Sequence, residues 1–261
     1  MNKKNYLQIL GCGASQGVPT SNGDWGACQK NSFNTRTRSS IFLKINNFNL
    51  LFDTSPDLRF QLFKNKILKI DYVFFTHIHA DHIFGINDLR AFYLTNGKRI
   101  NIFSTKETVS FLEKHFKYLF KNHKNYPAIL KSNVIQNSLL IKNKISKIKI
   151  ERIDVIHGSV KTIGFKIDNR IAYIPDVKTI PEKTIKKIKN IPFLIIDCFR
   201  FKKHNLHVNL EEVMAYVKKI NPAKVFLTHM SKDIDYNFIK KKLKKFKNTV
   251  PCYDGMIIKI S

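Results

Sequence analysis

Short apolar runs near the start of the chain predict strands. Runs rich in β-branched and aromatic residues, which are typical of buried strands, occur at residues 6–10, 39–45, 48–52, 72–75 and 100–103. A helix is predicted from Ser104, because Ser104 and Glu107 form a capping-box pattern. Apolar positions at helical spacing follow it: Val109, Leu112, Phe116 and Leu119.

Strands and helices alternate in the second half of the chain. Asp168 and Asn169 predict a hairpin turn between strands at 164–167 and 171–174. Beyond the turn the pattern predicts helices at 181–189, 209–220 and 235–246, and strands at 193–197, 224–228 and 256–260. Asn209 and Glu212 repeat the capping pattern, whereas residues 122–146 give no clear pattern.

Histidine and aspartate recur where predicted strands end. The stretch THIHADH, residues 76–82, follows one strand, and His157, Asp176 and His229 each follow another. Side chains placed at several strand ends can converge on one rim of a sheet. Imidazole and carboxylate ligands without cysteine suit Zn²⁺, Mn²⁺ or Fe²⁺, and seven of them are too many for one tetrahedral ion. Two metals are therefore expected.

Length and composition favour one domain over residues 1–261, with 43% hydrophobic residues to form its core. We expect no signal peptide and no membrane segment, because no apolar stretch approaches about 18 residues. The four cysteines are widely spaced and include no CxxC. That spacing predicts reduced thiols and a cytoplasmic protein.

The formal net charge of +27 allows two interpretations. A basic surface binds nucleic acid through its phosphates. The charge is spread along the chain, however, with its densest run at Lys240–Lys247, and abundant Lys, Asn, Ile and Phe are typical of an AT-rich genome. We favour a solvated surface of biased composition over a nucleic-acid interface. Either surface attracts small anionic substrates.

THIHADH and the later HG, PD and THM elements resemble the metallo-β-lactamase superfamily, whose hallmark is HxHxDH. Four further segments, GCGASQGVPTSNGDWGAC, RTRSS, DTSPDLR and GINDLR, resemble its phosphoribosyl cyclic phosphodiesterase (PhnP-like) branch. The resemblance covers essentially the whole chain. It implies an α/β fold of the four-layer αββα sandwich type.

The resemblance also implies a ligand set. It assigns His77, His79 and His157 to one metal, Asp81, His82 and His229 to the other, and Asp176 to a bridging position. Two divalent ions, zinc or manganese, would share a water, lower its pKa and leave a hydroxide for in-line attack. Asp81 thereby counts as catalytic as well as ligating.

Three residues receive supporting roles. Asp53, which ends NLLFD, resembles the superfamily's aspartate that holds the histidine loop; a simple turn residue is the alternative. His207, just ahead of the NLEE helix start, matches the branch's histidine that acts as general acid. His204 is the competing candidate and is assigned to substrate binding.

Two segments are candidates for holding the substrate. Arg36, Arg38, Ser39 and Ser40 offer guanidinium and hydroxyl donors to a phosphate, although the same pattern also fits an exposed turn. The loop GCGASQGVP offers backbone amides but lacks the GK[ST] of a P-loop.

The chain departs from the branch at one site. Some of these phosphodiesterases hold an extra zinc through a cysteine cluster and a later histidine. Here only Cys28 remains, Gly23 and Trp25 occupy the matching places, and Lys232 stands where that histidine would be. We therefore expect no zinc at this position.

Three functions follow from these observations. The first is a metal-dependent phosphodiesterase acting on small cyclic or diester phosphates. The second is a tRNA 3′-end endonuclease of the RNase Z type, and the third is a non-catalytic metal-binding protein. The sequence does not fix the oligomeric state, and a homodimer stays open.

Overall fold

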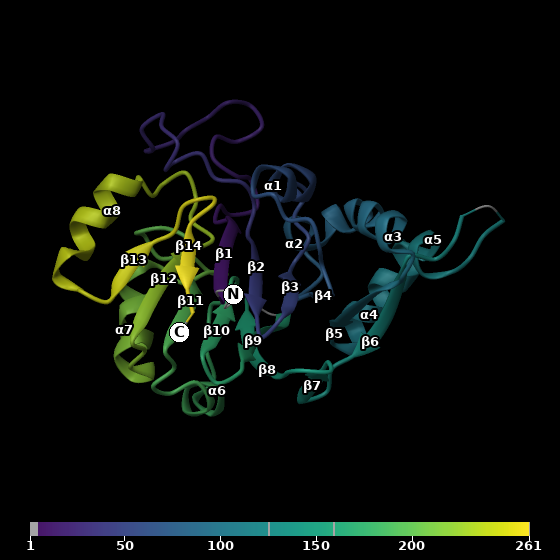
Figure 1. The fold of residues 1–261 in the computed structure, drawn as a ribbon. Coiled ribbons are helices and arrows are strands. Elements are labelled where there is room, and N and C mark those ends of the chain that lie inside the picture. Colours follow the sequence, from purple (N-terminus) through teal and green to yellow (C-terminus); the bar gives the residue numbers. More distant parts are fainter. Residues whose placement is uncertain (1–4, 125, 159, 261) are drawn as a thin grey trace. The chain divides into compact units, whose positions relative to one another are not determined.

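The chain forms two compact units, each built on one β-sheet (Figure 1). The computed structural model describes residues 5–124, 126–158 and 160–260. Unit 1 contains Ser40–Gln136, the N-terminal residues through Leu10, and the C-terminal residues from Gly255; unit 2 contains Gly11–Ser39 and Asn137–Asp254. The single domain over residues 1–261 stays a prediction.

The sheet of unit 1 has the strand order β14-β1-β2-β3-β4-β5-β6. Its strands are β1 (Tyr6–Gly11), β2 (Ser40–Ile45), β3 (Phe48–Phe52), β4 (Tyr72–Phe74), β5 (Ile100–Ser104), β6 (Leu130–Val134) and β14 (Ile257–Lys259). Strands β3 to β6 run parallel, whereas β2 and β3 form an antiparallel hairpin. All the strands predicted in this half are confirmed to within a residue or two.

Helices cover one face of this sheet. They are α1 (Leu58–Lys64), α2 (Ala80–Ile83), the 3-10 helix η1 (Phe84–Leu89), α3 (Arg90–Asn96), α4 (Lys106–His115) and α5 (Lys117–Phe120). Leu51, Val73 and Ile102 of the strands share one buried cluster with Leu58 and Leu112 of the helices. Since side chains alternate along a strand, the neighbouring residues face the other way. There Phe74 stacks between Phe52 and Phe103, with ring centroids 5.0 and 5.3 Å apart.

Two sequence predictions in unit 1 were wrong in detail. The cap of α4 is Thr105, whose hydroxyl accepts from Thr108 N, because the Ser104 hydroxyl donates to the Phe75 carbonyl instead. The helix also stops at Phe116, which leaves the helical conformation (φ −117°, ψ 35°), and α5 follows as a separate turn.

The sheet of unit 2 has the order β13-β12-β11-β10-β9-β8-β7. Its strands are β7 (Ser138–Lys142), β8 (Lys147–His157), β9 (Val160–Ile167), β10 (Ile171–Ile174), β11 (Phe193–Asp197), β12 (Lys224–Thr228) and β13 (Thr249–Pro251). Strands β10 to β13 run parallel. Strands β6 and β7 occupy the segment 122–146 that gave no pattern, and β13 was not predicted.

Local sequence signals in unit 2 act as predicted. Asp168 and Asn169 both have positive φ (49° and 53°), as a two-residue hairpin turn of type I′ requires, and they join β9 to β10. Asn209 caps α7 (Leu210–Ile220) with a capping box, in which Glu212 N donates to Asn209 and Asn209 N donates to Glu212, each over 2.9 Å.

The remaining helices are α6 (Glu182–Lys187), α8 (Tyr236–Lys242) and the 3-10 helix η2 (Leu243–Lys245). Across the residues that the structure describes, no helix combines the length and hydropathy needed to cross a bilayer. The four cysteines are buried free thiols, and burial raises the pKa of each.

Gly85 tests how tightly η1 packs on the loop after β3. A Cβ at Gly85 would lie 2.0 Å from the Ser55 carbonyl oxygen and 2.7 Å from Leu58 Cβ. We expect Gly85→Ala to lower the free energy of unfolding by about 3 kcal/mol or more, measured by urea denaturation. Gly97→Ala is the control, because φ is +64° there but nothing lies within 4 Å; it should cost only about 1 kcal/mol. Similar losses for both variants would contradict the close packing.

Candidate metal centre

Asp53 organises the histidine loop of unit 1. It follows β3 with a positive φ of 61°, and both its side chain and its backbone are buried against β4. Its carboxylate accepts from Thr76 N (2.8 Å), from the Thr76 hydroxyl (3.0 Å) and from His82 Nδ1 (2.9 Å). The Thr76 hydroxyl in turn lies 2.9 Å from His77 Nδ1. Asp53 thus orients His82 directly and His77 through Thr76.

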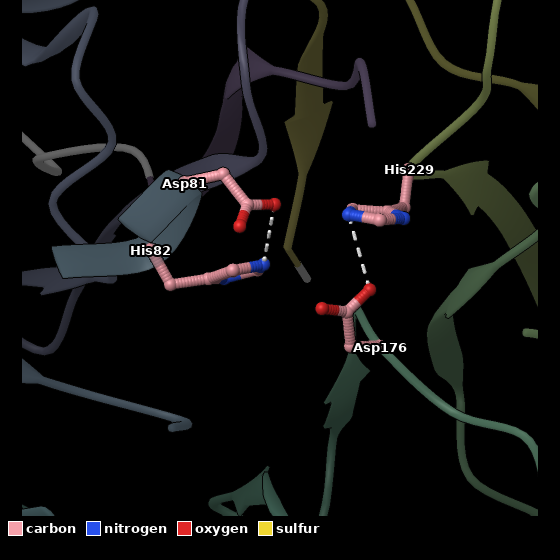
Figure 2. A group of neighbouring side chains, drawn as sticks. All are labelled: Asp81, His82, Asp176 and His229. Carbon is pink, nitrogen blue, oxygen red and sulfur yellow. Dashed lines mark ion pairs between the residues drawn. The ribbon is translucent and has the colours of Figure 1, made fainter. Parts of the chain in front are cut away.

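The four candidate ligands of unit 1 lie together as a result. His77 Nε2 is 3.0 Å from His79 Nδ1, and His82 Nε2 is 3.3 Å from an Asp81 oxygen (Figure 2). The sequence predicted all four in a loop, but Asp81 and His82 belong to the single turn α2. With Nδ1 of His77 and His82 held from behind, Nε2 of each is the atom presented to a metal.

Asp197 does the same work in unit 2. It ends β11, is fully buried, and one carboxylate oxygen accepts from His207 Nδ1 (2.9 Å) and Val177 N (3.2 Å). Its other oxygen lies 3.8 Å from His229 Nδ1. Val177 directly follows Asp176, so Asp197 touches or neighbours three candidate residues at once.

The unit 2 cluster is compact. Asp176 lies 3.0 Å from His229 Nε2 (Figure 2) and 3.5 Å from His207 Nδ1. Asp176, Asp197, His207 and His229 are all buried and present ligand atoms within 4.8 Å of one another. Such a group suits a divalent ion.

His157 joins this unit from the end of β8. Its Nδ1 donates to the Leu206 carbonyl over 2.9 Å, which leaves Nε2 as the lone-pair nitrogen. The next residue must be glycine, because a Cβ at Gly158 would lie 2.4 Å from Leu206 Cδ2 and φ is +61°. The HG element therefore lets the Leu206 loop close onto His157.

The two histidines proposed for acid chemistry have different settings. His207 is buried and its ring stacks on Phe199 at 4.5 Å and on His229 at 5.0 Å. His204 lies farther out, 5.2 Å from the His207 ring. Burial, followed by the nearby His207, lowers the pKa of His204 below its ordinary value. Of the two, only His207 contacts a buried carboxylate.

The predicted phosphate-binding residues have unequal settings. The Arg36 side chain is buried, and its guanidinium donates to the carbonyls of Ser231 (3.1 Å) and Ile234 (2.6 Å). The hydroxyls of Ser39 and Ser40 are buried and donate to backbone carbonyls as well. These three are used inside the protein, which favours structural roles for them. Arg38 alone of the four is partly exposed.

Protein groups join the segments where some relatives hold zinc. Ala27 N donates to the Lys232 carbonyl over 2.9 Å, and Cys28 Sγ lies 3.2 Å from the carbonyls of both Lys232 and Ile234. Asp24 also forms an ion pair with Lys232. The loop carrying Cys28 is therefore held to the loop after His229 by bonds of the chain itself.

The sequence assigned no role to Asp197. A signal was present, because FLIID ends an all-apolar strand with aspartate just as NLLFD does at Asp53. An ionisable group at the end of a buried strand has to be paired, which marks it for attention.

Comparison with known proteins decides the family. Residues 48–230 match the beta-lactamase superfamily domain. The chain belongs to this superfamily. The crystal structure of a diphosphatase from the PhnP family is 27% identical, with a TM-score of 0.88 over 99% of this chain and 98% of that one. The predicted αββα fold class and the PhnP-like branch are thereby confirmed.

Curated relatives match parts of longer proteins. An octanoyltransferase of Porphyromonas gingivalis is 26% identical over 226 residues, 85% of this chain. A ribonuclease Z of Staphylococcus epidermidis is 30% identical over 129 residues, 46% of this chain. The matches span 45% and 38% of these relatives, less than half of either. Superfamily membership and the two His/Asp clusters together imply divalent metal binding.

The supporting role of Asp53 can be tested with a matched substitution on the same strand. Asp53→Asn removes the charge that fixes His77 and His82, so affinity for zinc should fall about 10- to 100-fold, measured by competition with a chromophoric chelator. Asp71→Asn is the control, because Asp71 precedes β4 at its opposite end and accepts from Asn49. An equal loss of zinc affinity in both variants would show a general folding effect instead.

Proposed function

We propose that this protein is a dinuclear metal hydrolase that cleaves small cyclic or diester phosphates. The observation that carries the proposal is the pair of His/Asp clusters, each oriented by a buried aspartate at a strand end. The similarity to a PhnP-family diphosphatase over nearly the whole of both chains supports phosphorus chemistry. That relative's activity also makes a diphosphate bond a candidate target.

The ligand assignment follows the superfamily order. His77, His79 and His157 would hold one ion, Asp81, His82 and His229 the other, and Asp176 would bridge them. This donor set, all imidazole and carboxylate, fits zinc or manganese. When bound, such ions supply Lewis-acid stabilisation of phosphoryl oxygens and lower the pKa of water toward neutrality. Asp81 belongs to the catalytic set in this scheme.

His207 is the proposed proton donor to the leaving oxygen. Its Nδ1–H donates to Asp197, so Nε2 is the atom that carries and releases the proton. The buried Asp197 carboxylate stabilises the imidazolium before the transfer, and the Phe199 ring fixes the plane of the imidazole. An alkoxide leaving group departs readily only with such a donor.

A tRNA 3′-end endonuclease is the second candidate. Several ribonuclease Z sequences match the chain, and the charge of +27 would attract RNA. Within the described part of residues 122–146, however, the backbone forms β6 and β7 rather than a long arm that would grip tRNA. A non-catalytic metal-binding protein ranks third, because all seven superfamily ligand positions are filled.

The metal content is the first test of the proposal. Protein purified without chelator should contain two transition ions per chain by elemental analysis, because seven nitrogen and oxygen ligands make a two-metal site. Asp176→Ala should lose at least one of them and nearly all activity. Three tightly held zinc ions, or none after reconstitution, would contradict the assignment.

A substrate panel tests the chemistry. Cyclic and linear phosphodiesters and a diphosphate should be hydrolysed by the metal-loaded protein, whereas a carboxyl thioester should not. Precursor tRNA should bind weakly, with an affinity that collapses as salt rises, because only nonspecific phosphate contacts are available. Specific cleavage at a tRNA 3′ end would reverse the order of the first two candidates.

A leaving-group comparison tests His207. His207→Ala should lose roughly 10²- to 10⁴-fold in kcat on a diester with an alkoxide leaving group. It should lose little on a p-nitrophenyl diester, whose phenolate departs unaided, and should retain both metals. His204→Ala is the matched control. Equal losses on both substrates, or a larger alkoxide-specific loss for His204→Ala, would move the role away from His207.

A further inference from the structure

Unit 2 contains a polar cavity that the metal ligands do not line. Its volume is about 590 Å³, and its walls include Ser15, Gln16, Thr20, Asp24, Arg38 and Lys232. Two of these side chains are cations and one is a carboxylate; the other three carry hydroxyl or amide groups. An uncharged or apolar ligand has little to recognise in such a lining.

Three separate segments are joined to form this cavity. Gly13 pairs with both Arg38 and Met230 through short β-bridges. Ala14 N donates to the Met230 carbonyl over 3.2 Å, and Met230 N donates to the Cys12 carbonyl over 2.9 Å. The glycine-rich loop and Arg38, both candidate anion-binding segments in the sequence, therefore meet beside the segment that carries Lys232.

Arg38 is placed by a close approach to the loop. A Cβ at Gly17 would lie 3.6 Å from Arg38 Cδ and 3.7 Å from Arg38 Nη1, so the arginine side chain passes directly over this glycine. Gly17 also has φ of +68°, which favours glycine at that turn. The turn thus serves both the loop and the arginine.

The two cations retain donors for a ligand. Lys232 forms an ion pair with Asp24, yet an ammonium has three N–H donors. Arg38 offers a planar fork of donors that matches phosphate oxygens. The hydroxyl and amide groups around them, with the Asp24 carboxylate, suit a hydroxylated carbon frame. The combined chemistry is that of a phosphomonoester on a polyol.

The cavity is close to the proposed reaction site along the chain. Lys232 follows His229 by three residues, so their Cα atoms are at most about 11 Å apart. We propose that this cavity binds a second phosphate group of the substrate, remote from the phosphorus that is attacked. The inference rests on the proposed function. It also gives a role to Lys232, the residue by which this chain departs from zinc-holding relatives.

A matched pair of substrates tests the proposal kinetically. One is a p-nitrophenyl phosphodiester of glycerol that carries a terminal phosphomonoester; the other lacks only that phosphate. Arg38→Gln and Lys232→Gln should each raise KM for the first substrate at least about tenfold more than for the second, the size of a lost charge-assisted contact. Lys245→Gln, an exposed lysine of η2, should show no such difference. Equal effects on both substrates would overturn the proposal.

Equilibrium binding separates this proposal from the proposed function. Calorimetric titration of the full chain with glycerol 3-phosphate should give the same affinity with metals bound and after chelation. Arg38→Gln should weaken it about tenfold, and Lys232→Arg should retain binding that Lys232→Gln loses. Binding that disappears with the metals would overturn the cavity assignment. Metal-independent binding without any phosphodiester turnover would instead refute the proposed function alone.

Discussion

A buried carboxylate at the end of a strand is the constraint on which each half of the candidate centre depends. Asp53 after β3 and Asp197 at the end of β11 are both inaccessible to solvent and both receive a histidine Nδ1–H over 2.9 Å. Burying an unpaired carboxylate is costly, so the partners must be in place when the unit folds. Orientation of the histidines is thereby coupled to the stability of the strands beneath them.

This coupling explains features that seem unrelated in the sequence. Asp53 adopts φ of 61°, an unfavourable backbone conformation for a residue other than glycine, and the hydrogen bonds to Thr76 and His82 offset that cost. The chain after Asp53 then runs so close to η1 that Gly85 has room for no side chain. In unit 2, His229 also has positive φ (54°) next to the Asp197 carboxylate. Strain is concentrated around the same two aspartates.

The sequence predicts those parts of the fold that depend on local chemistry. Apolar strands, the Asp168–Asn169 turn and the Asn209 capping box follow from side-chain alternation and backbone preferences. It fails where tertiary contacts decide: Ser104 bonds to Phe75 and cedes the cap to Thr105. Strands β6 and β7 were missed because each exposes most of its residues and so lacks a strong alternation.

The candidate site divides in the same way. The HxHxDH motif and its ordered partners identify the ligands, because metal chemistry restricts residue type and spacing. Sequence does not tell a buried arginine from an exposed one, so Arg36 and Arg38 look equivalent until Arg36 is seen bonded to backbone carbonyls. Lys232 and Asp197 matter through contacts with residues distant in sequence, Asp24 and His207.

Charge and recognition operate at different ranges in this protein. A net charge of +27 raises the local concentration of every anion, and salt screens that attraction over about 8 to 10 Å. Such a field cannot tell one phosphate ester from another. Discrimination requires donors at hydrogen-bond distance, fixed in direction by the backbone around them. Since the superfamily ligands are shared by proteins with different activities, substrate choice must come from loops outside the ligand set, such as the one that Gly13 and Gly17 shape around Arg38.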